Sequence, residues 1–259
     1  MMSLPFNKYQ GAGNDFIMID NRNSFFNPHD HFLIEKLCNR RFGIGADGLI
    51  LINSLPGYDF EMVYFNSDGY RGSMCGNGGR CAAAFAIKTG IVSGRMKFMA
   101  FDGIHEAYPD GEMINLKMND VKETQTVDGN PFINTGSPHC IIFRENIDEI
   151  DVFREGRIVR YSEGFKPGGT NVNFVETGND GIYVRTYERG VEDETLSCGT
   201  GVTASAIASV TAGHFDRGPV RVRTKGGNLT VDFRIEDNQI KDIWLKGPAV
   251  FVFEGNIEI

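Results

Sequence analysis

Residues 74–90 read MCGNGGRCAAAFAIKTG, and residues 197–213 read SCGTGVTASAIASVTAG. Both stretches place glycines one and three positions after a cysteine, then a run of small apolar residues, then a glycine fifteen positions after the cysteine. The offset from Cys75 to Cys198 is 123 residues, close to half of the 259-residue chain. An offset of this length is too long for a solenoid repeat. It predicts two equivalent domains that arose by duplication.

The segment after each cysteine is expected to form a buried helix, because a helix with small apolar residues on all sides belongs inside a core. Gly90 suits the position just after the first helix, where a left-handed backbone is favoured. A further helix is predicted in DHFLIEKLCNRRF at 30–42, with Asp30 as its N-cap. The apolar residues expected along this helix are Phe32, Leu33, Leu37 and Phe42.

Most of the remaining chain alternates short apolar runs with glycine- and aspartate-containing turns, which predicts strands. We therefore expect an α+β (mixed α/β) fold with two pseudo-symmetric domains, each a mostly antiparallel sheet wrapped around a central small-residue helix. The polar, turn-rich stretch NDVKETQTVDGNP at 119–131 marks a boundary. The predicted domains are residues 1–120, joined by the C-terminal strand 248–259, and residues 121–247.

Composition excludes several classes of protein. The chain is 41% hydrophobic and 23% charged, which is typical of globular proteins, and its net charge of −8 argues against a nucleic-acid partner. The sequence contains neither a membrane-spanning apolar run nor a signal-peptide pattern, so we expect a cytoplasmic protein with no membrane partner. Five cysteines without CxxC spacing favour neither a disulfide scaffold nor a structural metal site.

A cysteine before a helix has two chemical consequences. The first turn of a helix carries outward-pointing N–H groups and partial positive charge, so it binds anions, and Gly-x-Gly lets an anion approach the backbone. The same charge stabilises a thiolate and lowers the thiol's pKa. Cys75 and Cys198 are therefore each expected to be a reactive thiol beside a site for a carboxylate-sized anion. The alternative is that both are buried packing residues, as many free cysteines are.

Two such thiols suit the inversion of a carbon centre. If a pseudo-twofold axis relates the halves, one thiolate can remove a proton from one face of a carbon while the other thiol supplies a proton to the opposite face. The α-proton of an amino acid is very weakly acidic. Helix N-termini directed at the substrate's carboxylate would stabilise the carbanion that forms.

Five regions of the sequence resemble the diaminopimelate epimerase family. They are GAGNDF at 11–16, FNSDG and MCGNGGR between 65 and 80, GSPHC at 136–140, TNVNF at 170–174, and YERGVEDETLSCGTG at 187–201. The resemblance implies an isomerase without a cofactor, independent of PLP, that interconverts LL- and meso-2,6-diaminopimelate in lysine and cell-wall precursor biosynthesis. It implies a small-molecule substrate and a two-domain fold, and it leaves a homodimer open.

The resemblance also assigns roles to individual residues. Cys75 and Cys198 match the two proton-transfer cysteines, and His139 and Glu188 match residues that tune the thiols. The residues that match substrate-binding positions are Asn14, Gly48, Asn66, Gly76, Asn77, Ser137, Asn171, Glu188, Arg189, Gly199 and Thr200. Arg189 suits a distal carboxylate because its planar guanidinium binds carboxylates through two hydrogen bonds.

The sequence departs from the family pattern at four places. One is Thr200, which is serine in some members and should make no difference if the backbone N–H binds the ligand. Gly48 stands where some members have glutamine, so a side-chain contact is missing there. Ser137 stands where many have asparagine, and serine can still donate and accept hydrogen bonds. The stretch RGVEDETLSC is one residue longer than the commoner form, so we expect its loop to bulge before Cys198.

Two other functions stay open from the sequence alone. One is a racemase for another amino acid such as proline, which would need no contacts to a distal amino-acid group. The other is a non-catalytic module that binds a small anion at the two helix N-termini. The remaining cysteines, Cys38, Cys81 and Cys140, are expected to be packing residues. His139 and Cys140 are adjacent on a strand, so their side chains point to opposite faces and do not pair.

Overall fold

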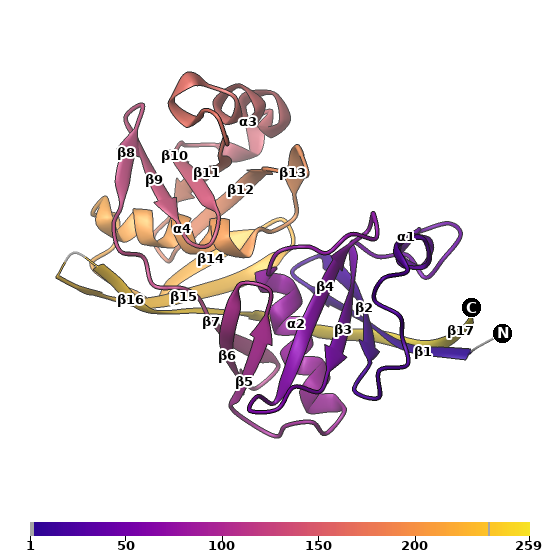
Figure 1. The fold of residues 1–259 in the computed structure, drawn as a ribbon. Helices are drawn as coiled ribbons and strands as arrows, with labels where there is room; N and C mark the ends of the chain where they lie inside the picture. Colours follow the sequence, from indigo (N-terminus) through magenta and orange to yellow (C-terminus); the bar gives the residue numbers. More distant parts are fainter. Residues whose placement is uncertain (1–2, 238) are drawn as a thin grey trace. The chain divides into compact units, whose positions relative to one another are not determined.

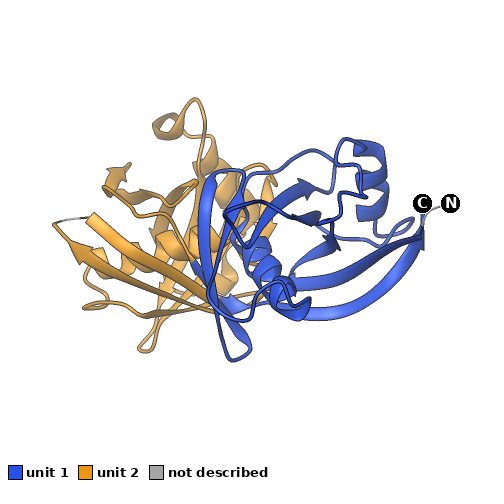
Figure 2. Cartoon of the chain, turned by 60° about the horizontal axis from the view of Figure 1, so that its bottom comes forward, with its two compact units in different colours: residues 1–116, 247–259 blue, residues 117–246 orange. Residues whose placement is uncertain are grey.

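The computed structural model describes residues 3–237 and 239–259, which form two compact units (Figures 1 and 2). Unit 1 comprises the chain up to Leu116 together with Gly247–Ile259, and unit 2 comprises Lys117–Lys246. The chain therefore passes from unit 1 to unit 2 near residue 116 and returns near residue 247.

Unit 1 is a mixed sheet around a central helix. Its elements are β1 (Ser3–Gly11), β2 (Asn14–Asp20), α1 (His31–Cys38), β3 (Gly48–Asn53), β4 (Phe60–Asn66), α2 (Gly76–Lys88), β5 (Met96–Ala100), β6 (Gly103–Asp110), β7 (Met113–Lys117) and β17 (Val250–Glu258). The hydrogen-bonded order is β17-β1-β2-β3-β4-β5-β6-β7. Helix α2 contacts β1, β2, β3, β4, β6 and β17, so the sheet curves around it.

Unit 2 repeats this arrangement. Its elements are β8 (Gln125–Val127), β9 (Asn130–Asn134), β10 (Pro138–Phe143), η1 (Ile147–Glu149), α3 (Val152–Arg160), η2 (Glu163–Phe165), β11 (Asn171–Thr177), β12 (Ile182–Glu188), β13 (Asp193–Thr195), α4 (Gly199–Thr211), β14 (Val220–Thr224), β15 (Gly227–Glu236) and β16 (Gln239–Pro248). The order is β8-β9-β10-β11-β12-β14-β15-β16, with β13 also paired to β12. Helix α4 contacts β9, β10, β11, β12, β14 and β15.

The two units have the same topology. Along each strand order the pairings are antiparallel, antiparallel, parallel, antiparallel, parallel, antiparallel and antiparallel. In each unit the central helix comes after the fifth strand of this order and before the sixth, namely after β4 in unit 1 and after β12 in unit 2. The predicted α+β fold with two pseudo-symmetric sheets, each around a small-residue helix, is confirmed.

The two central helices are buried as their composition predicts. Ala82, Ala83 and Ala86 of α2 are fully buried, as are the alanines at the centre of α4. Small side chains let the curved sheet approach the helix closely on several sides. Gly90 follows α2 with φ of +71°, the left-handed conformation expected for it.

The prediction for α1 was right about its start and wrong about its end and its buried side. The side chain of Asp30 accepts a hydrogen bond from the N–H of Leu33, as an N-cap does. The helix ends at Cys38, because the Asn39 side chain accepts the N–H groups of the two residues at 41 and 42 and holds the chain in a turn. The residues that α1 buries are Ile34, Leu37 and Cys38. Phe32 and Phe42 are 85% and 80% exposed.

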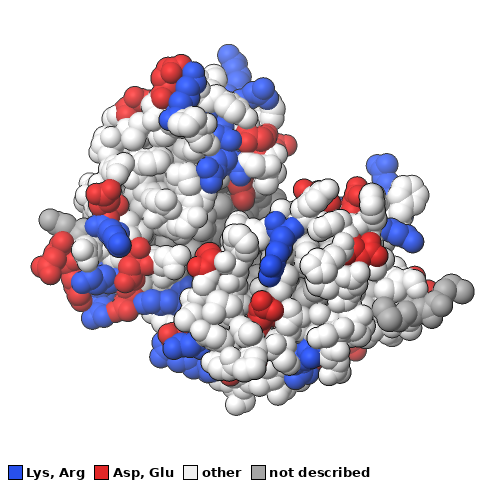
Figure 3. Space-filling model, in the orientation of Figure 1, with Lys and Arg blue, Asp and Glu red and all other residues white. Residues whose placement is uncertain are grey.

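Charged side chains of both signs are interspersed on the face shown in Figure 3. Among the helices formed by residues 3–237 and 239–259, none is long and apolar enough to span a membrane.

Candidate active site

Cys75 and Cys198 occupy the same local structure in the two units. Each is the N-cap of its central helix, and their backbones are nearly identical, with φ and ψ of −111° and 123° for Cys75 and −112° and 113° for Cys198. In each helix the first intrahelical hydrogen bond, 2.8 Å long, is accepted by the carbonyl oxygen of the cysteine. The N–H groups of the first turn therefore point out of the helix end, beside the thiol.

In unit 1, several predicted site residues lie around Cys75. Cys75 Sγ donates to Asn14 Oδ1 at 3.5 Å, and Asn77 Nδ2 donates to the same oxygen at 3.5 Å. Gly48 and Asn66 are directly paired across β3 and β4. Because Asn14 begins β2, Gly48 begins β3 and Asn66 ends β4, these residues share one end of the unit-1 sheet.

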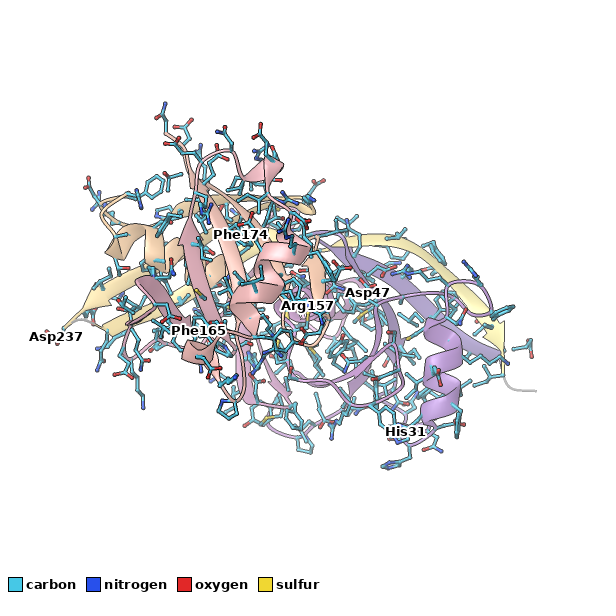
Figure 4. All side chains as sticks on the ribbon, turned by 90° about the horizontal axis from the view of Figure 1, so that it is seen from above. His31, Asp47, Arg157, Phe165, Phe174 and Asp237 are labelled. Atoms are coloured by element: carbon cyan, nitrogen blue, oxygen red, sulfur yellow. The ribbon has the colours of Figure 1, made fainter. Side chains whose placement is uncertain are left out.

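Asp47 fixes the orientation of Asn14, a role that the sequence did not reveal. Its Oδ2 accepts a 2.6 Å hydrogen bond from Asn14 Nδ2, and its Oδ1 accepts one of 2.7 Å from Arg40 (Asp47 is labelled in Figure 4). Arg40 also binds both carboxylate oxygens of Asp15, which pairs with Lys8. Burial alone would raise the pKa of Asp15, but the hydrogen bonds from Arg40 and Lys8 hold it well below its usual range. In the sequence, the only indication of this role was that an aspartate follows each of the two glycine-containing stretches, Asp15 after GAGN and Asp47 after GIGA.

Gly48 has a steric reason to be glycine in this chain. A Cβ there would lie 2.5 Å from the backbone oxygen of Phe65 and 2.5 Å from Cε2 of Tyr64. The Tyr64 ring packs edge-on against Phe16, with 6.0 Å between ring centroids. A side chain at position 48 would therefore collide with the Tyr64 ring and with the backbone of Phe65.

Arg80, in the first turns of α2, is a second residue near Cys75 that sequence reasoning did not single out. Its side chain is fully buried. It donates to Asn77 Oδ1 at 2.8 Å, to Gly76 O at 3.4 Å and to Pro248 O at 3.3 Å. Burial lowers the pKa of Arg80, while the neighbouring thiols of Cys81 and Cys75 act against this. Arg80 therefore fixes the Asn77 side chain and links α2 to the returning segment 247–259.

In unit 2, Ser137, Asn171 and Arg189 form one hydrogen-bonded group. Asn171 Nδ2 donates to Ser137 Oγ and to Pro138 O, both at 2.8 Å. The backbone N–H of Arg189 donates to Asn171 Oδ1 at 2.8 Å, and its Nη2 lies 3.5 Å from Ser137 Oγ. The guanidinium is thereby held beside a hydroxyl and an amide, an arrangement that suits a carboxylate ligand.

His139 approaches Cys198 through Thr200. His139 Nε2 lies 2.9 Å from Thr200 Oγ1, and that hydroxyl lies 3.4 Å from Cys198 Sγ. Burial, together with the charge of Arg189, lowers the pKa of His139 to about 3, against a smaller opposing effect of the hydrogen bond with Asn173. The imidazole is therefore neutral at physiological pH.

The longer stretch before Cys198 folds as a tight turn followed by β13. Glu192, at φ of +59°, accepts hydrogen bonds from the N–H of Gly190 at 3.0 Å, from Tyr161 Oη at 2.9 Å and from Arg160 Nη2 at 3.1 Å. Next to this turn, Glu188 Oε2 accepts a 2.8 Å hydrogen bond from Thr195 Oγ1. Glu192 is thus anchored to the C-terminal end of α3, and its N–H donates to Glu188 O at 2.8 Å, which ties the turn to the end of β12.

The other three cysteines are packing residues, as predicted. Cys38, Cys81 and Cys140 are buried, and burial raises the pKa of each thiol to about 12. Within the described part of the chain, His, Cys, Asp and Glu side chains form no group of three or more that is placed to hold a metal ion.

Solved structures of low sequence identity share the fold. A phenazine biosynthesis protein of the PhzF family from Bacillus anthracis matches with a TM-score of 0.81 at 17% identity, over all of both chains. A hydroxyproline epimerase from Agrobacterium vitis, with bound trans-4-hydroxy-L-proline, matches with a TM-score of 0.69 at 12% identity, over 98% of this chain and 92% of that one. At these identities the likeness shows the fold alone.

Sequence comparison is more specific. The family model described as diaminopimelate epimerase matches residues 6–119 and 132–252. A diaminopimelate epimerase of Flavobacterium psychrophilum is 51% identical over 96% of this chain and 98% of its own length. Those of Aquifex aeolicus and Chlorobaculum tepidum are 42% and 44% identical, over 98% and 96% of this chain and 98% and 99% of their own lengths. On this evidence, the chain belongs to the diaminopimelate epimerase family.

Proposed function

We propose that this protein is an isomerase that converts LL-2,6-diaminopimelate to meso-diaminopimelate, in the biosynthesis of lysine and of cell-wall precursors. Relatives between 33% and 51% identical, over nearly their full lengths, are named diaminopimelate epimerase. The observation that carries the proposal is the duplicated half-site, in which Cys75 and Cys198 have the same backbone conformation at the start of a buried helix.

The proposed chemistry is a two-base proton transfer between the cysteines and one α-carbon. The thiolate of one cysteine forms an S–H bond with the α-proton, and the C–H electron pair stays on carbon. The thiol of the other cysteine gives its proton to the opposite face of that carbon and becomes the thiolate. No net oxidation occurs, and the proton that one thiolate takes up is matched by the proton that the other thiol gives. The chemistry requires both half-sites to act on the same carbon.

Stabilising the carbanion is the harder part of the reaction. The first-turn amides of α2 (Gly76 and Asn77) and of α4 (Gly199 and Thr200) are donors suited to the carboxylate next to the reacting carbon, where negative charge develops. Because the helices lie in apolar cores, their N-terminal charge acts through a medium of low dielectric constant. This arrangement supports a role in carbanion stabilisation as well as in substrate binding.

The second amino-acid group of the substrate explains the remaining polar residues. Arg189, held beside Ser137 and Asn171, suits its carboxylate, and Glu188 suits its ammonium. Asn14 and Asn66 at the end of the unit-1 sheet complete the proposed contacts. A substrate with a single small amino-acid group, such as proline, would leave this set of residues without a ligand.

An assay of purified protein tests the proposal directly. LL-diaminopimelate, L-proline and trans-4-hydroxy-L-proline are each incubated with the protein in the presence of EDTA and without added cofactor, and stereoisomers are separated by chiral chromatography. We expect inversion of diaminopimelate alone. Inversion of a proline instead would overturn the substrate, and binding without inversion of any of the three would support a non-catalytic anion-binding module.

We also propose that the protein acts as a homodimer in the cytoplasm, with domains 1–120 plus 248–259 and 121–247. Val250, Phe251, Val252 and Phe253 of β17 are each 38–51% exposed; Phe253 packs against Phe6 and Phe251 against Tyr9, on opposite faces of β1. A strand with exposed apolar side chains is a place where another chain can pair. Sedimentation of the wild type and of Val252→Glu tests the dimer: the wild type should sediment as a dimer and the variant as a monomer.

Cell fractionation tests the proposed cytoplasmic location. Limited proteolysis tests the proposed domain boundary, since cleavage should occur near residues 119–131.

A further inference from the structure

A chain of hydrogen bonds runs through the interior of unit 2 to Cys198. Thr186 Oγ1 on β12 donates to Asn173 Oδ1 on β11 at 2.9 Å, and Asn173 Nδ2 lies 3.0 Å from His139 Nδ1 on β10. His139 Nε2 then contacts Thr200 Oγ1, which contacts Cys198 Sγ. Asn173 and His139 are fully buried and Thr186 is 3% exposed, so the protein and not solvent determines the direction of these bonds.

One backbone carbonyl fixes the direction of the whole chain. Cys140 O lies 3.3 Å from the Asn173 side chain, and a peptide carbonyl oxygen can only accept a hydrogen bond. The amide group that faces it must therefore be the NH₂ of Asn173, which leaves Oδ1 to accept from Thr186. The same NH₂ also donates to His139 Nδ1. That nitrogen must carry a lone pair, so the neutral imidazole of His139 has its hydrogen on Nε2.

The tautomer of His139 decides which way Thr200 points. Nε2–H donates to Thr200 Oγ1, so the hydroxyl hydrogen of Thr200 must be directed to another acceptor. The sulfur of Cys198, 3.4 Å away, is the other partner of this hydroxyl. A hydrogen bond donated to sulfur stabilises the thiolate relative to the thiol. We propose that Asn173 is a positioning residue that, through His139, directs the Thr200 hydroxyl at Cys198 and so favours its thiolate.

The packing of α4 supports this proposal. A Cβ on Gly201 would lie 2.4 Å from Asn173 Oδ1 and 3.2 Å from the His139 ring. Glycine at 201 therefore lets the first turn of the helix rest directly on the hydrogen-bonded pair. This is a stronger reason for glycine there than the approach of an anion, which the Gly-x-Gly pattern alone suggested.

Two charged residues at the end of β12, Glu188 and Arg189, lie near this chain of hydrogen bonds. Arg189 is the cation that acts on His139, and Glu188 is bonded to Thr195 at the end of β12. Cys75, in the other unit, has a different partner, because its thiol donates to Asn14 Oδ1, which Asp47 holds in that direction. Cys75 therefore serves as an internal reference when the reactivity of Cys198 is measured.

The inference deepens the proposed function, since it concerns one of the two proton-transfer thiols, but its tests use the free protein and need no substrate. The first test is nitrogen NMR of protein labelled with ¹⁵N-histidine. The His139 signal is the one that remains when each of the other four histidines is replaced by glutamine in turn. We expect the Nε2–H tautomer throughout pH 5–9. An Nδ1–H tautomer or a charged ring would overturn the proposal.

The second test measures alkylation of Cys198 and Cys75 by iodoacetamide at several pH values, with each peptide quantified by mass spectrometry. Thr200→Val should slow the reaction of Cys198 near pH 7 about ten-fold, the effect expected for losing one hydrogen bond to a charged group. Thr200→Ser should restore the alkylation rate of Cys198. Asn173→Leu should lower that rate and allow His139 to adopt the Nδ1–H tautomer. Cys75 should react at its usual rate in all of them.

Thr203→Val is the matched control. Its hydroxyl is buried in the same helix but donates at 2.9 Å to Gly199 O, and not to a thiol. We expect wild-type alkylation of Cys198 in this variant. Two results would show that the Thr200 hydroxyl has only a structural role and that the proposal is wrong. One is alkylation of Cys198 at the wild-type rate in folded Thr200→Val. The other is that Thr203→Val slows this alkylation as much as Thr200→Val does. If the valine variants fail to fold, the tautomer of His139 measured by NMR in the wild type still tests the proposal.

Discussion

Arg80 in α2 and Thr203 in α4 occupy the same position in the two halves of the chain, five residues after the N-cap cysteine. Both are fully buried, and each donates to the carbonyl oxygen of the residue four positions earlier, at 3.4 Å and 2.9 Å. Arg80 also binds Asn77 Oδ1 and Pro248 O. The two central helices thus begin with the same backbone conformation but differ in charge near the N-cap cysteine.

Replacing Arg80 should cost more stability than replacing Thr203. Arg80→Met removes the donor that Arg80 supplies to Asn77 Oδ1 and Pro248 O, whereas Gly76 O still accepts the helical N–H of residue 80. We therefore expect the free energy of unfolding to fall by about 3 kcal/mol. Thr203→Val should lower it by about 1 kcal/mol, since the carbonyl it loses still accepts the helical N–H. Guanidinium unfolding curves measure both. Equal losses of unfolding free energy in the two variants would show that the contacts of Arg80 with Asn77 and Pro248 do not contribute to stability.

Cys75→Ser and Cys198→Ser should each abolish turnover of diaminopimelate while the fold remains intact. A serine hydroxyl is far less acidic than a thiol, so it can neither take nor give the α-proton at neutral pH. Chiral chromatography measures turnover, and circular dichroism checks the fold. Cys140→Ser, a buried cysteine in a core, is the control and should keep its turnover if it folds. An active single mutant at 75 or 198 would exclude the two-base mechanism.

In heavy water, the inverted α-carbon of the product should carry deuterium from the solvent. Thiol protons exchange with water, so the thiol that protonates the carbanion carries deuterium before it reacts. Mass spectrometry of the product, with a parallel reaction in ordinary water, measures the incorporation. Retention of the original protium would mean that the proton never reaches an exchangeable group.

Arg189→Ala should raise KM for diaminopimelate about 10- to 100-fold, since it removes the guanidinium that we propose binds the distal carboxylate through two charge-assisted hydrogen bonds. Arg189→Lys should restore part of this, because the charge remains and the planar fork is lost. Arg154→Ala, an exposed arginine of α3, is the control and should have wild-type KM. Steady-state kinetics provide the test, and an unchanged KM in Arg189→Ala would remove the assignment.

Glu192 should contribute stability that disappears in acid. Burial alone would raise its pKa, but hydrogen bonds from Gly190, Tyr161 and Arg160 outweigh this and lower it from 4.5 to about 2. The unfolded chain therefore takes up a proton on this group at higher pH than the folded protein, and the stabilisation, complete above about pH 5, is lost between pH 4.5 and 2.

Thermal unfolding of the wild type and of Glu192→Gln tests this sign. Glu192→Gln should have a lower melting temperature than the wild type at pH 7. The difference between the two melting temperatures should become smaller as the pH falls from 4.5 toward 2. Glu163→Gln, whose side chain is 87% exposed, is the matched control and should melt with the wild type across this range. A gap that stayed constant from pH 7 to 2.5 would contradict the prediction.

Local features of the fold could be predicted from sequence because their causes are local. The start of each central helix follows from a cysteine before Gly-x-Gly, the left-handed Gly90 from its place after α2, and the cap of α1 from Asp30. The buried side of α1 could not be predicted in the same way. Phe32 and Phe42 fit an apolar pattern, yet Asn39 ends the helix early and both rings remain exposed.

The sequence by itself determined the duplication, the two-unit fold class and the two cysteines, since these depend on spacing and on short segments. Only the tertiary structure showed that Asp47 binds Asn14, that Arg80 binds Asn77 and that Asn173 contacts His139. Each of these contacts depends on how strands or helix turns meet in space, because strand register decides which side chains become neighbours. Residue type and spacing predicted the candidate reactive groups, and packing determined which hydrogen-bonding side chains surround them.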